Sequence, residues 1–123
     1  MTQSRKHRGY NTQRIVADYY RANGWPYAEP VGAGRMGSDI TGMPGIDIEV
    51  KARRGFDPLA AMRQQADRAA IGDLAFAVLR MDGQRPAVIG SWPVVIRLDT
   101  LTELLRAAGY GDEQETATGS TNE

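Results

Sequence analysis

The sequence predicts an α/β fold in which a mixed central sheet is flanked by helices. Three patterns lead to this prediction: apolar residues at helical spacing near the N-terminus, alternation of polar and apolar residues over 46–51, and a continuous apolar run over 74–80. A helix expected between the last two completes the order α-β-β-β-α-β, to which a weaker strand and a short helix are appended.

The first elements follow from local signals. Residues 1–9 are polar and basic and are expected to form a flexible arm. Asn11 is a suitable N-cap for a helix over residues 12–23, which Gly24 would end. Residues 25–31 are expected to form the first strand.

A tight hairpin is expected next. The turn Gly42-Met43-Pro44-Gly45 folds the chain back antiparallel and can bring Asp39 beside Glu49. Alternation with a period of two puts Asp47, Glu49 and Lys51 on one face of the second arm of the hairpin, opposite its isoleucine and valine side chains.

The C-terminal half contains five further segments. Residues 57–70 are expected to form a helix, because an Asp-Pro pair supplies an N-cap and a proline at the first helical position. Residues 74–80 are expected to form a strand buried on both faces, and residues 86–91 a weaker strand. Residues 100–108 form an amphipathic helical pattern, and residues 111–123 are expected to be disordered.

Composition limits the class of protein. The chain has 123 residues, with 41% hydrophobic and 24% charged, which suits one domain, expected over residues 10–110. It has no run of ~18 apolar residues and no signal-peptide pattern, so we expect a cytoplasmic protein that does not bind membranes. The absence of cysteine excludes disulfides, and a single histidine excludes multi-histidine metal sites. A metal would therefore need oxygen ligands, which favours Mg²⁺ or Mn²⁺.

The formal net charge of zero hides an uneven distribution. Four of the 15 acidic residues lie in the segment 111–123, which contains no basic residue, so residues 1–110 carry 15 basic side chains against 11 acidic. A basic body with an acidic tail suits a polyanionic partner without requiring one.

The glycine-rich segment 32–37 has the spacing G-x-G-x-x-G of a dinucleotide-binding loop. That motif needs a helix immediately after it, whereas a strand-like stretch interrupted by Gly42 and Pro44 follows here. We therefore reject a nucleotide cofactor. Two readings stay open: a flexible turn, or a loop whose backbone approaches DNA phosphate closely, with Arg35 assisting.

The expected hairpin carries two carboxylates and one ammonium group that could form a functional site. Asp39, Glu49 and Lys51 could be a solvated surface with mixed charges, and the spacing alone is short enough to arise by chance. The surrounding elements favour a functional site, because two carboxylates can bind Mg²⁺ and a neighbouring cation can assist attack of water on a phosphodiester.

On these residues the chain resembles the PD-(D/E)xK nuclease superfamily, and within it the archaeal-type Holliday junction resolvases and their bacteriophage relatives. Segment 5–23 resembles their basic start and first helix, 34–51 their glycine/serine loop and catalytic hairpin, and 74–80 their buried strand. Glu49-Val50-Lys51 is the most specific part. The resemblance implies a restriction-endonuclease-like αβββαβ core.

The resemblance also implies roles for individual residues. Asp39 and Glu49 would bind Mg²⁺, for which Mn²⁺ can substitute, with the Val50 carbonyl as a third ligand. Lys51 would orient the attacking water or stabilise charge on the phosphate. Gln13 stands where the first helix of the family often supplies a glutamate, and it would hold a metal-bound water through its amide oxygen. One further departure is that Ser38 replaces the proline of the family name.

Three other polar residues have open roles. Asp47 could add a carboxylate to the metal site or lie at the solvent end of the strand, and we favour the solvent end. Gln64 or Gln65 could reach the site from the second helix, although each taken singly is better explained as an exposed helical glutamine.

Eight residues are expected to contact DNA, because three basic clusters converge on the same motif. They are Arg5, Lys6, Arg8, Gly34, Arg35, Ser38, Arg53 and Arg54. The aromatic residues Trp25, Tyr27 and Trp92 are better explained as core or dimer contacts than as surfaces for base stacking.

The expected function is a Mg²⁺-dependent endodeoxyribonuclease for branched DNA, with Holliday junctions as the best candidate substrate. A symmetric junction is cut on two strands, so we expect a homodimer, with the helix over 100–108 or the face carrying Trp92 at its interface. The alternatives are a less selective nuclease for recombination, repair or DNA packaging, a DNA-binding module that does not cleave, and a protein-interaction domain.

Overall fold

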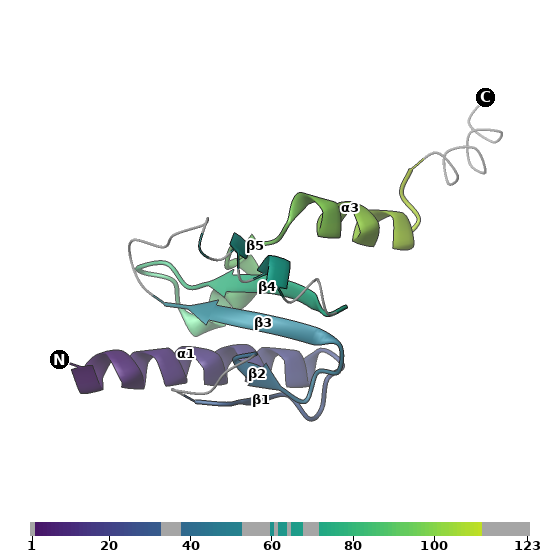
Figure 1. Ribbon diagram of the computed structural model, residues 1–123. Coiled ribbons are helices and arrows are strands. Elements are labelled where there is room, and N and C mark those ends of the chain that lie inside the picture. The colour runs from purple at the N-terminus through teal and green to yellow at the C-terminus, as the bar shows by residue number, and fades with distance from the viewer. Residues whose placement is uncertain are drawn as a thin grey trace.

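The computed structural model describes the backbone of residues 2–32, 38–52, 60, 62–63, 65–67 and 72–111, and the side chains of these residues from Gly9 onward. Along the described chain the elements are α1, β1, β2, β3, β4, a 3₁₀ helix (η1), β5 and α3, with helical turns between β3 and β4. The protein is a mixed α/β fold, as predicted, in which α1 runs along one side of the strands (Figure 1).

Helix α1 spans Thr2–Ala22, so it begins well before the predicted start at Thr12. Its backbone includes residues 2–9, which were predicted to precede the helix, so the predicted start of the helix was wrong. The predicted flexibility of this segment stays a prediction. The helix ends where Gly24 adopts a φ of 113°, a conformation that side chains disfavour.

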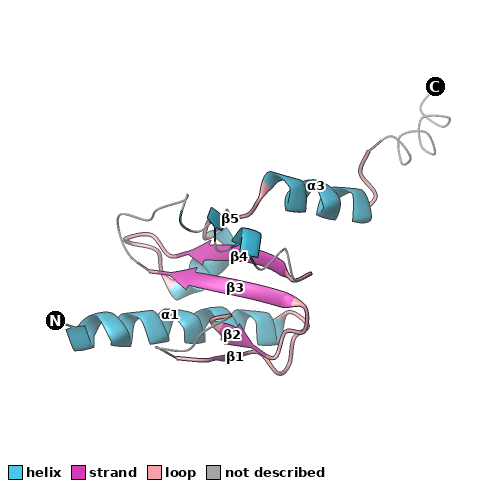
Figure 2. Ribbon diagram, in the orientation of Figure 1, coloured by secondary structure: helices cyan, strands magenta, loops and turns pink. Residues whose placement is uncertain are grey.

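The strands form two small sheets. Strands β1 (Glu29–Pro30) and β2 (Ile40–Thr41) pair antiparallel. Strand β3 (Ile46–Lys51) pairs in parallel with β4 (Leu74–Leu79), and β4 pairs antiparallel with β5 (Val94–Val95). A parallel pair needs a crossover connection, and the helical backbone at residues 60–67, where described, lies within it (Figure 2).

Two predicted strands differ from the structure. The first strand contains only Glu29–Pro30, because backbone hydrogen bonds from Trp25 N to Tyr20 O and from Ala28 N to Trp25 O hold the preceding residues in turns. Residues Pro86–Ser91 form η1 and not a strand, and the third strand of the sheet is β5 instead. Proline at the start of η1 has no N–H to donate to a ladder, which favours the helical turn.

The main core lies between α1 and the strands. Its buried members are Val16, Ala17, Ala28, Ile40, Met43, Ile48, Val78 and Trp92. Trp92 is only 5% exposed, and its indole Nε1 donates to the Arg85 carbonyl at 3.2 Å, so it belongs to the core and not to a surface available for a dimer. On the opposite face of the sheet, Ala75 and Ala77 are buried, as is Gln65 from the crossover.

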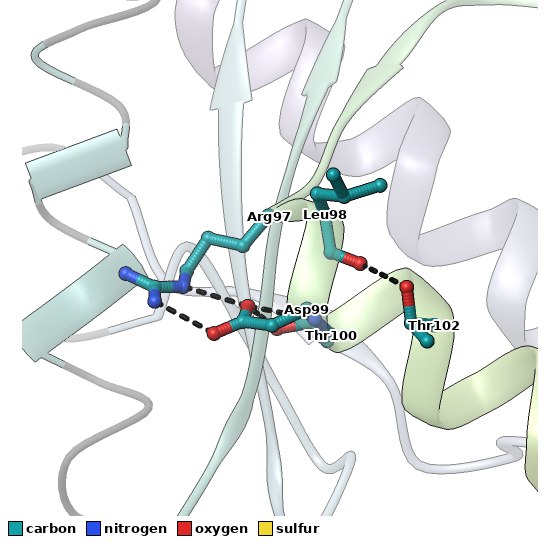
Figure 3. Close-up of polar contacts among 5 residues, drawn as sticks. All are labelled: Arg97, Leu98, Asp99, Thr100 and Thr102. Atoms are coloured by element: carbon teal, nitrogen blue, oxygen red, sulfur yellow. Dashed lines mark hydrogen bonds and ion pairs between the residues drawn. The ribbon is translucent and has the colours of Figure 1, made fainter.

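Helix α3 (Leu98–Ala107) matches the predicted C-terminal helix to within two residues. Figure 3 shows its first turn: Arg97 pairs with the Asp99 carboxylate, which also accepts from Thr100 N at 2.7 Å, and Thr102 Oγ1 donates to the Leu98 carbonyl. None of its residues is buried, and it projects away from the sheet (Figure 1). No helix in the described part of the chain combines the length and the apolar character needed to cross a bilayer.

Candidate metal and phosphodiester site

The segment Ser38–Asp39 crosses beside strand β3. Asp39 N donates to the Ile48 carbonyl at 2.8 Å, and the Ser38 hydroxyl accepts from Ile48 N at 2.9 Å. Ser38 Oγ also donates to the Ile40 carbonyl at 2.8 Å. A proline in this position could make none of these side-chain hydrogen bonds. The serine hydroxyl therefore connects the segment before β2 to β3.

The Asp39 carboxylate is directed at the backbone of β3. Its Oδ2 accepts from Val50 N at 2.7 Å, which places the aspartate next to Glu49, as the hairpin prediction expected. In an extended strand, the N–H and C=O of one residue point to the same edge. The Val50 carbonyl therefore lies on the edge of β3 that Asp39 occupies.

Glu49 and Lys51 share one face of β3, as their spacing predicts. Lys51 Nζ lies 3.2 Å from Glu49 Oε1, and both side chains are about one quarter exposed, at 28% and 24%. The ion pair is thus accessible to a ligand while it remains partly shielded from water. This geometry holds the ammonium beside the carboxylate that is predicted to bind metal.

Burial raises the pKa of Asp39 from 3.8 to about 6. The hydrogen bond from Val50 N and the charge of Lys51 act in the opposite direction, whereas the negative charges of Glu49 and Asp47 raise the pKa further. Burial and the neighbouring carboxylates thus make ionisation of Asp39 less favourable, and a cation bound to its carboxylate would favour ionisation.

Asp47 corrects one prediction. It was expected at the solvent end of the strand, but it is only 8% exposed. Ile48 packs toward α1, so the alternating Asp47 points to the other face of the sheet, where Ala75 and Gln65 are also buried. Its charge contributes to the raised pKa of Asp39, so Asp47 is an electrostatic neighbour of the site.

Gln13 joins α1 to the loop that leads to the site. It is 9% exposed, and its Oε1 accepts a hydrogen bond from Gly32 N at 3.1 Å. Val31 N in turn donates to the Asp39 carbonyl at 3.1 Å. Gln13 therefore contacts the site through Gly32 and Val31, with its amide oxygen engaged by the backbone.

Gln65 also differs from its prediction as an exposed glutamine. It is 3% exposed, and its Nε2 donates to the Val95 carbonyl at 3.0 Å, which ties the crossover to β5. The amide nitrogen of Gln65 is thus engaged by β5, which is separated from β3 by β4.

Several predicted residues lie outside the described part of the structure. They are Gly34, Arg35, Arg53, Arg54 and Gln64, together with the side chains of Arg5, Lys6 and Arg8, whose backbone belongs to α1. The predicted phosphate contacts of these residues therefore stay predictions.

Tyr10 was not among the residues predicted to form the site. Its ring lies against Gly32: a Cβ on that glycine would be 3.9 Å from Tyr10 Cδ1. The available signal was its position three residues before Gln13, since residues at this spacing are neighbours on a helix surface.

The donor set is small but suits Mg²⁺. Among the described side chains, no group of three or more His, Cys, Asp or Glu is arranged to hold a metal ion. Asp39, Glu49 and the Val50 carbonyl together offer three oxygen donors. Mg²⁺ is commonly held by one or two carboxylates and keeps several waters or phosphate oxygens, so this set fits the ion.

Comparison of the chain with models of protein families, with curated proteins and with solved structures gives no match.

Proposed function

We propose that this chain is a metal-dependent endodeoxyribonuclease that hydrolyses phosphodiesters in branched DNA, with four-way Holliday junctions as the preferred substrate. We further propose that its helices and strands form a restriction-endonuclease-like core of the PD-(D/E)xK type. The observation that supports the proposal is that Asp39, at the edge of β3, lies next to Glu49 and Lys51 on its face, with an ion pair of 3.2 Å and two carboxylates whose charges repel each other.

Asp39, Glu49 and the Val50 carbonyl would hold Mg²⁺, which when bound supplies positive charge that favours ionisation of water and stabilises charge on phosphate. Lys51 would donate a hydrogen bond to the attacking water or to a non-bridging phosphate oxygen. In-line attack forms the new P–O bond as the bond to the 3′ oxygen breaks. The products would be a 5′-phosphate and a 3′-hydroxyl.

The hydrogen bond from Val50 N supports the role of Asp39. Because Val50 N occupies one lone pair of Oδ2 at 2.7 Å, the carboxylate is fixed in orientation before any ligand arrives. A group held in advance loses little freedom on binding, which favours both metal affinity and rate.

Cationic residues of the N-terminal segment and of the segment after β3 would bind the DNA backbone. Arg5, Lys6 and Arg8 belong to the first turns of α1, and Arg53 and Arg54 follow directly on β3. Phosphate contacts of this kind position DNA without reading its sequence, which suits an enzyme that recognises branching.

A homodimer is part of this proposal, because resolution of a junction needs two cuts. Helix α3 is the candidate interface, since Leu98, Leu101, Leu104 and Leu105 are all exposed on it. Trp92 is buried in the core, so it is not proposed as part of the interface.

A second candidate function is a DNA-binding module that does not cleave. The contact from Gly32 N to Gln13 Oε1 favours it, because an amide oxygen used in this way adds no negative charge for a metal. A less selective nuclease would share the same site and differ only in its choice of DNA.

Cleavage of a labelled four-way junction tests the proposal, with linear duplex and single strand alongside, in Mg²⁺ and in EDTA. The Lys51→Ala protein controls for contaminating nuclease, and Arg14→Gln, a change on the exposed side of α1, controls for substitution itself. Paired nicks in the junction that disappear with EDTA and with Lys51→Ala, by about 100-fold or more, are expected.

The other outcomes separate the alternatives. Equal cutting of all three substrates would indicate a general nuclease. Tight binding without cutting in Mg²⁺ or Mn²⁺ would exclude the enzyme and leave the DNA-binding module.

A further inference from the structure

Tyr10 is an exposed aromatic residue that lies beside the backbone of Gly32. It belongs to α1 and is 48% exposed. A Cβ placed on Gly32 would be 3.9 Å from Tyr10 Cδ1 and 4.0 Å from Cε1. The ring therefore lies next to this stretch of backbone, and about half of the residue is open to solvent.

Gly32 directly follows Val31, the residue that is hydrogen-bonded to Asp39. Strands β1 and β2 pair Glu29 with Thr41 and Pro30 with Ile40, and Val31 N donates to the Asp39 carbonyl. Continuing this register places Gly32 opposite Ser38. The ring of Tyr10 thus packs beside the segment that carries the first predicted metal ligand.

Gln13 holds this arrangement in place. Its Oε1 accepts from Gly32 N at 3.1 Å, one helical turn after Tyr10 on α1. The same glycine therefore lies beside Tyr10 and donates a hydrogen bond to Gln13, and its φ of 88° disfavours any larger residue. Both residues of α1 thus lie at the segment that leads, through Val31, to Asp39.

We infer that Tyr10 stacks on a nucleobase or deoxyribose of the DNA strand bound at the Asp39–Glu49–Lys51 site, within a few nucleotides of the phosphate that is cut. The inference rests on the proposed function, because it assumes a DNA strand at that site. A base-stacking contact is tolerant of sequence, since every base offers a π-face. Successive bases on one strand are about 3.4 Å apart along the helix axis, and Gly32, beside the ring, is one residue from the Val31–Asp39 hydrogen bond, so the ring is expected to reach nucleotides close to the site.

The surroundings of Tyr10 suit stacking. Ordering a side chain on binding costs conformational entropy, and a ring that is only half exposed beside backbone has less freedom to lose than one in open solvent. Tyr27 provides the comparison within this chain. It is 80% exposed, but it lies at the other end of the hairpin, where its carbonyl faces Gly42.

The simpler explanation is that Tyr10 only covers the backbone of Gly32. Tyr10→Leu separates the two roles, because leucine retains an apolar cover but has no ring to stack. Tyr10→Phe retains the ring without the hydroxyl. Tyr27→Leu is the matched control for loss of an exposed tyrosine elsewhere.

The test uses four-way junctions with single 2-aminopurine substitutions near the branch point, in Ca²⁺ so that the strands stay intact. Base stacking on the protein is read as a change in 2-aminopurine fluorescence, and affinity is measured by titration. For the natural chain and Tyr10→Phe we expect a fluorescence change at one or two adjacent positions. For Tyr10→Leu we expect loss of that change and about tenfold weaker binding, and for Tyr27→Leu no difference from the natural chain.

A second measurement needs no substitution. Photocrosslinking of the natural chain to junctions that carry iododeoxyuridine, followed by mass spectrometry, is expected to identify Tyr10. This measurement decides the question if Tyr10→Leu fails to fold, as its melting curve would show.

The outcomes distinguish this inference from the proposed function. If the natural chain cleaves junctions but Tyr10→Leu matches it in affinity and fluorescence and no crosslink forms at Tyr10, the stacking role is wrong and the nuclease stands. If the crosslink forms at Tyr10 without any cleavage, the stacking role stands and the nuclease does not. If the natural chain binds no DNA, both are wrong.

Discussion

The carboxylate of Asp39 accepts a hydrogen bond from the backbone N–H of Val50, although the two residues are separated by the whole hairpin turn. This contact fixes the position of an acidic side chain that burial makes reluctant to ionise, since its pKa is raised to about 6. Both the stability of the fold and the activity of the site should therefore depend on the charge of Asp39.

Replacing Asp39 with asparagine should stabilise the protein at neutral pH. A carboxyl group with a raised pKa in the folded state binds its proton more tightly there than in the unfolded chain, so its contribution to stability is lost as pH rises from about 4 to about 6. The asparagine side chain would keep an oxygen acceptor for Val50 N without the charge. In EDTA, urea unfolding of Asp39→Asn should give about 1 kcal/mol more stability than the natural chain at pH 7, after allowance for partial exposure.

The difference between the two proteins should vanish near pH 4. Asp99→Asn is the control of opposite sign, because the hydrogen bonds from Arg97 lower the pKa of Asp99 to about 2. That exposed carboxylate is expected to stabilise the fold at pH 7, so its replacement should lower stability. A stability loss in Asp39→Asn at pH 7 would contradict the account of its raised pKa.

Cleavage should depend on pH through Asp39. The carboxylate must be ionised to bind a cation, so the rate of junction cleavage should rise as pH increases toward and past 6. Metal and proton compete for the same oxygen atoms, and more Mg²⁺ should therefore move the midpoint of the profile to lower pH. Rates measured at two Mg²⁺ concentrations between pH 5 and 8 check this expectation, and a midpoint insensitive to Mg²⁺ would argue against Asp39 as a ligand.

Gln13→Ala should destabilise the protein by about 1–2 kcal/mol, because it leaves the N–H of Gly32 without its acceptor. Gln13→Glu keeps an oxygen in that position and should remain closer to the natural chain in urea unfolding. Titration calorimetry with Mg²⁺ on both variants measures any separate role in metal binding. Equal stability of Gln13→Ala and the natural chain would show that the contact with Gly32 is unimportant.

Gly42→Ala should be severely destabilising, by more than about 3 kcal/mol, or prevent folding. A Cβ on Gly42 would lie 1.9 Å from the Tyr27 carbonyl oxygen, and the φ of 80° also disfavours a side chain. Gly45→Ala is the matched control: its φ is 76°, but nothing lies within 4 Å of its Cβ position. We expect a cost of only about 1–2 kcal/mol there, from backbone strain alone. Similar melting temperatures for the two variants would contradict the steric argument.

Leu101→Asp with Leu105→Asp should convert a dimer to a monomer if α3 forms the interface. Neither leucine is buried in one copy of the chain, at 39% and 43% exposure, so monomer stability should change by less than about 1 kcal/mol. Light scattering over a range of concentrations gives the oligomeric state. Val88→Asp, a change at an apolar residue 51% exposed in η1, serves as the control.

Sequence patterns predicted how the candidate site residues are arranged around β3. The alternation over residues 46–51 correctly placed Glu49 and Lys51 on one face, because a strand has a strict period of two. The Gly/Pro turn correctly predicted that Asp39 lies next to this strand. Both predictions depended on local geometry that a short segment determines by itself.

The errors arose where distant segments decide the structure. Alternation shows that Asp47 is opposite Ile48 but not whether its face is covered, because burial of that face depends on residues distant in sequence. Residues 86–91 are a short apolar run, for which strand and helical turn cannot be separated by pattern alone. The contact between Gln13 and Gly32 joins residues 19 positions apart, and no local pattern predicts it.

Helix α3 has one consequence for how this chain behaves in solution. An isolated helix of fewer than about 12 residues is only marginally stable in water, and α3 has ten residues with none buried. Its helical state therefore depends on something beyond its own backbone hydrogen bonds, such as the Arg97–Asp99 pair at its start or a surface that covers its leucines. The helical fraction of α3 should then rise as more of that surface becomes available. Circular dichroism of this segment would therefore measure directly how much of α3 is covered.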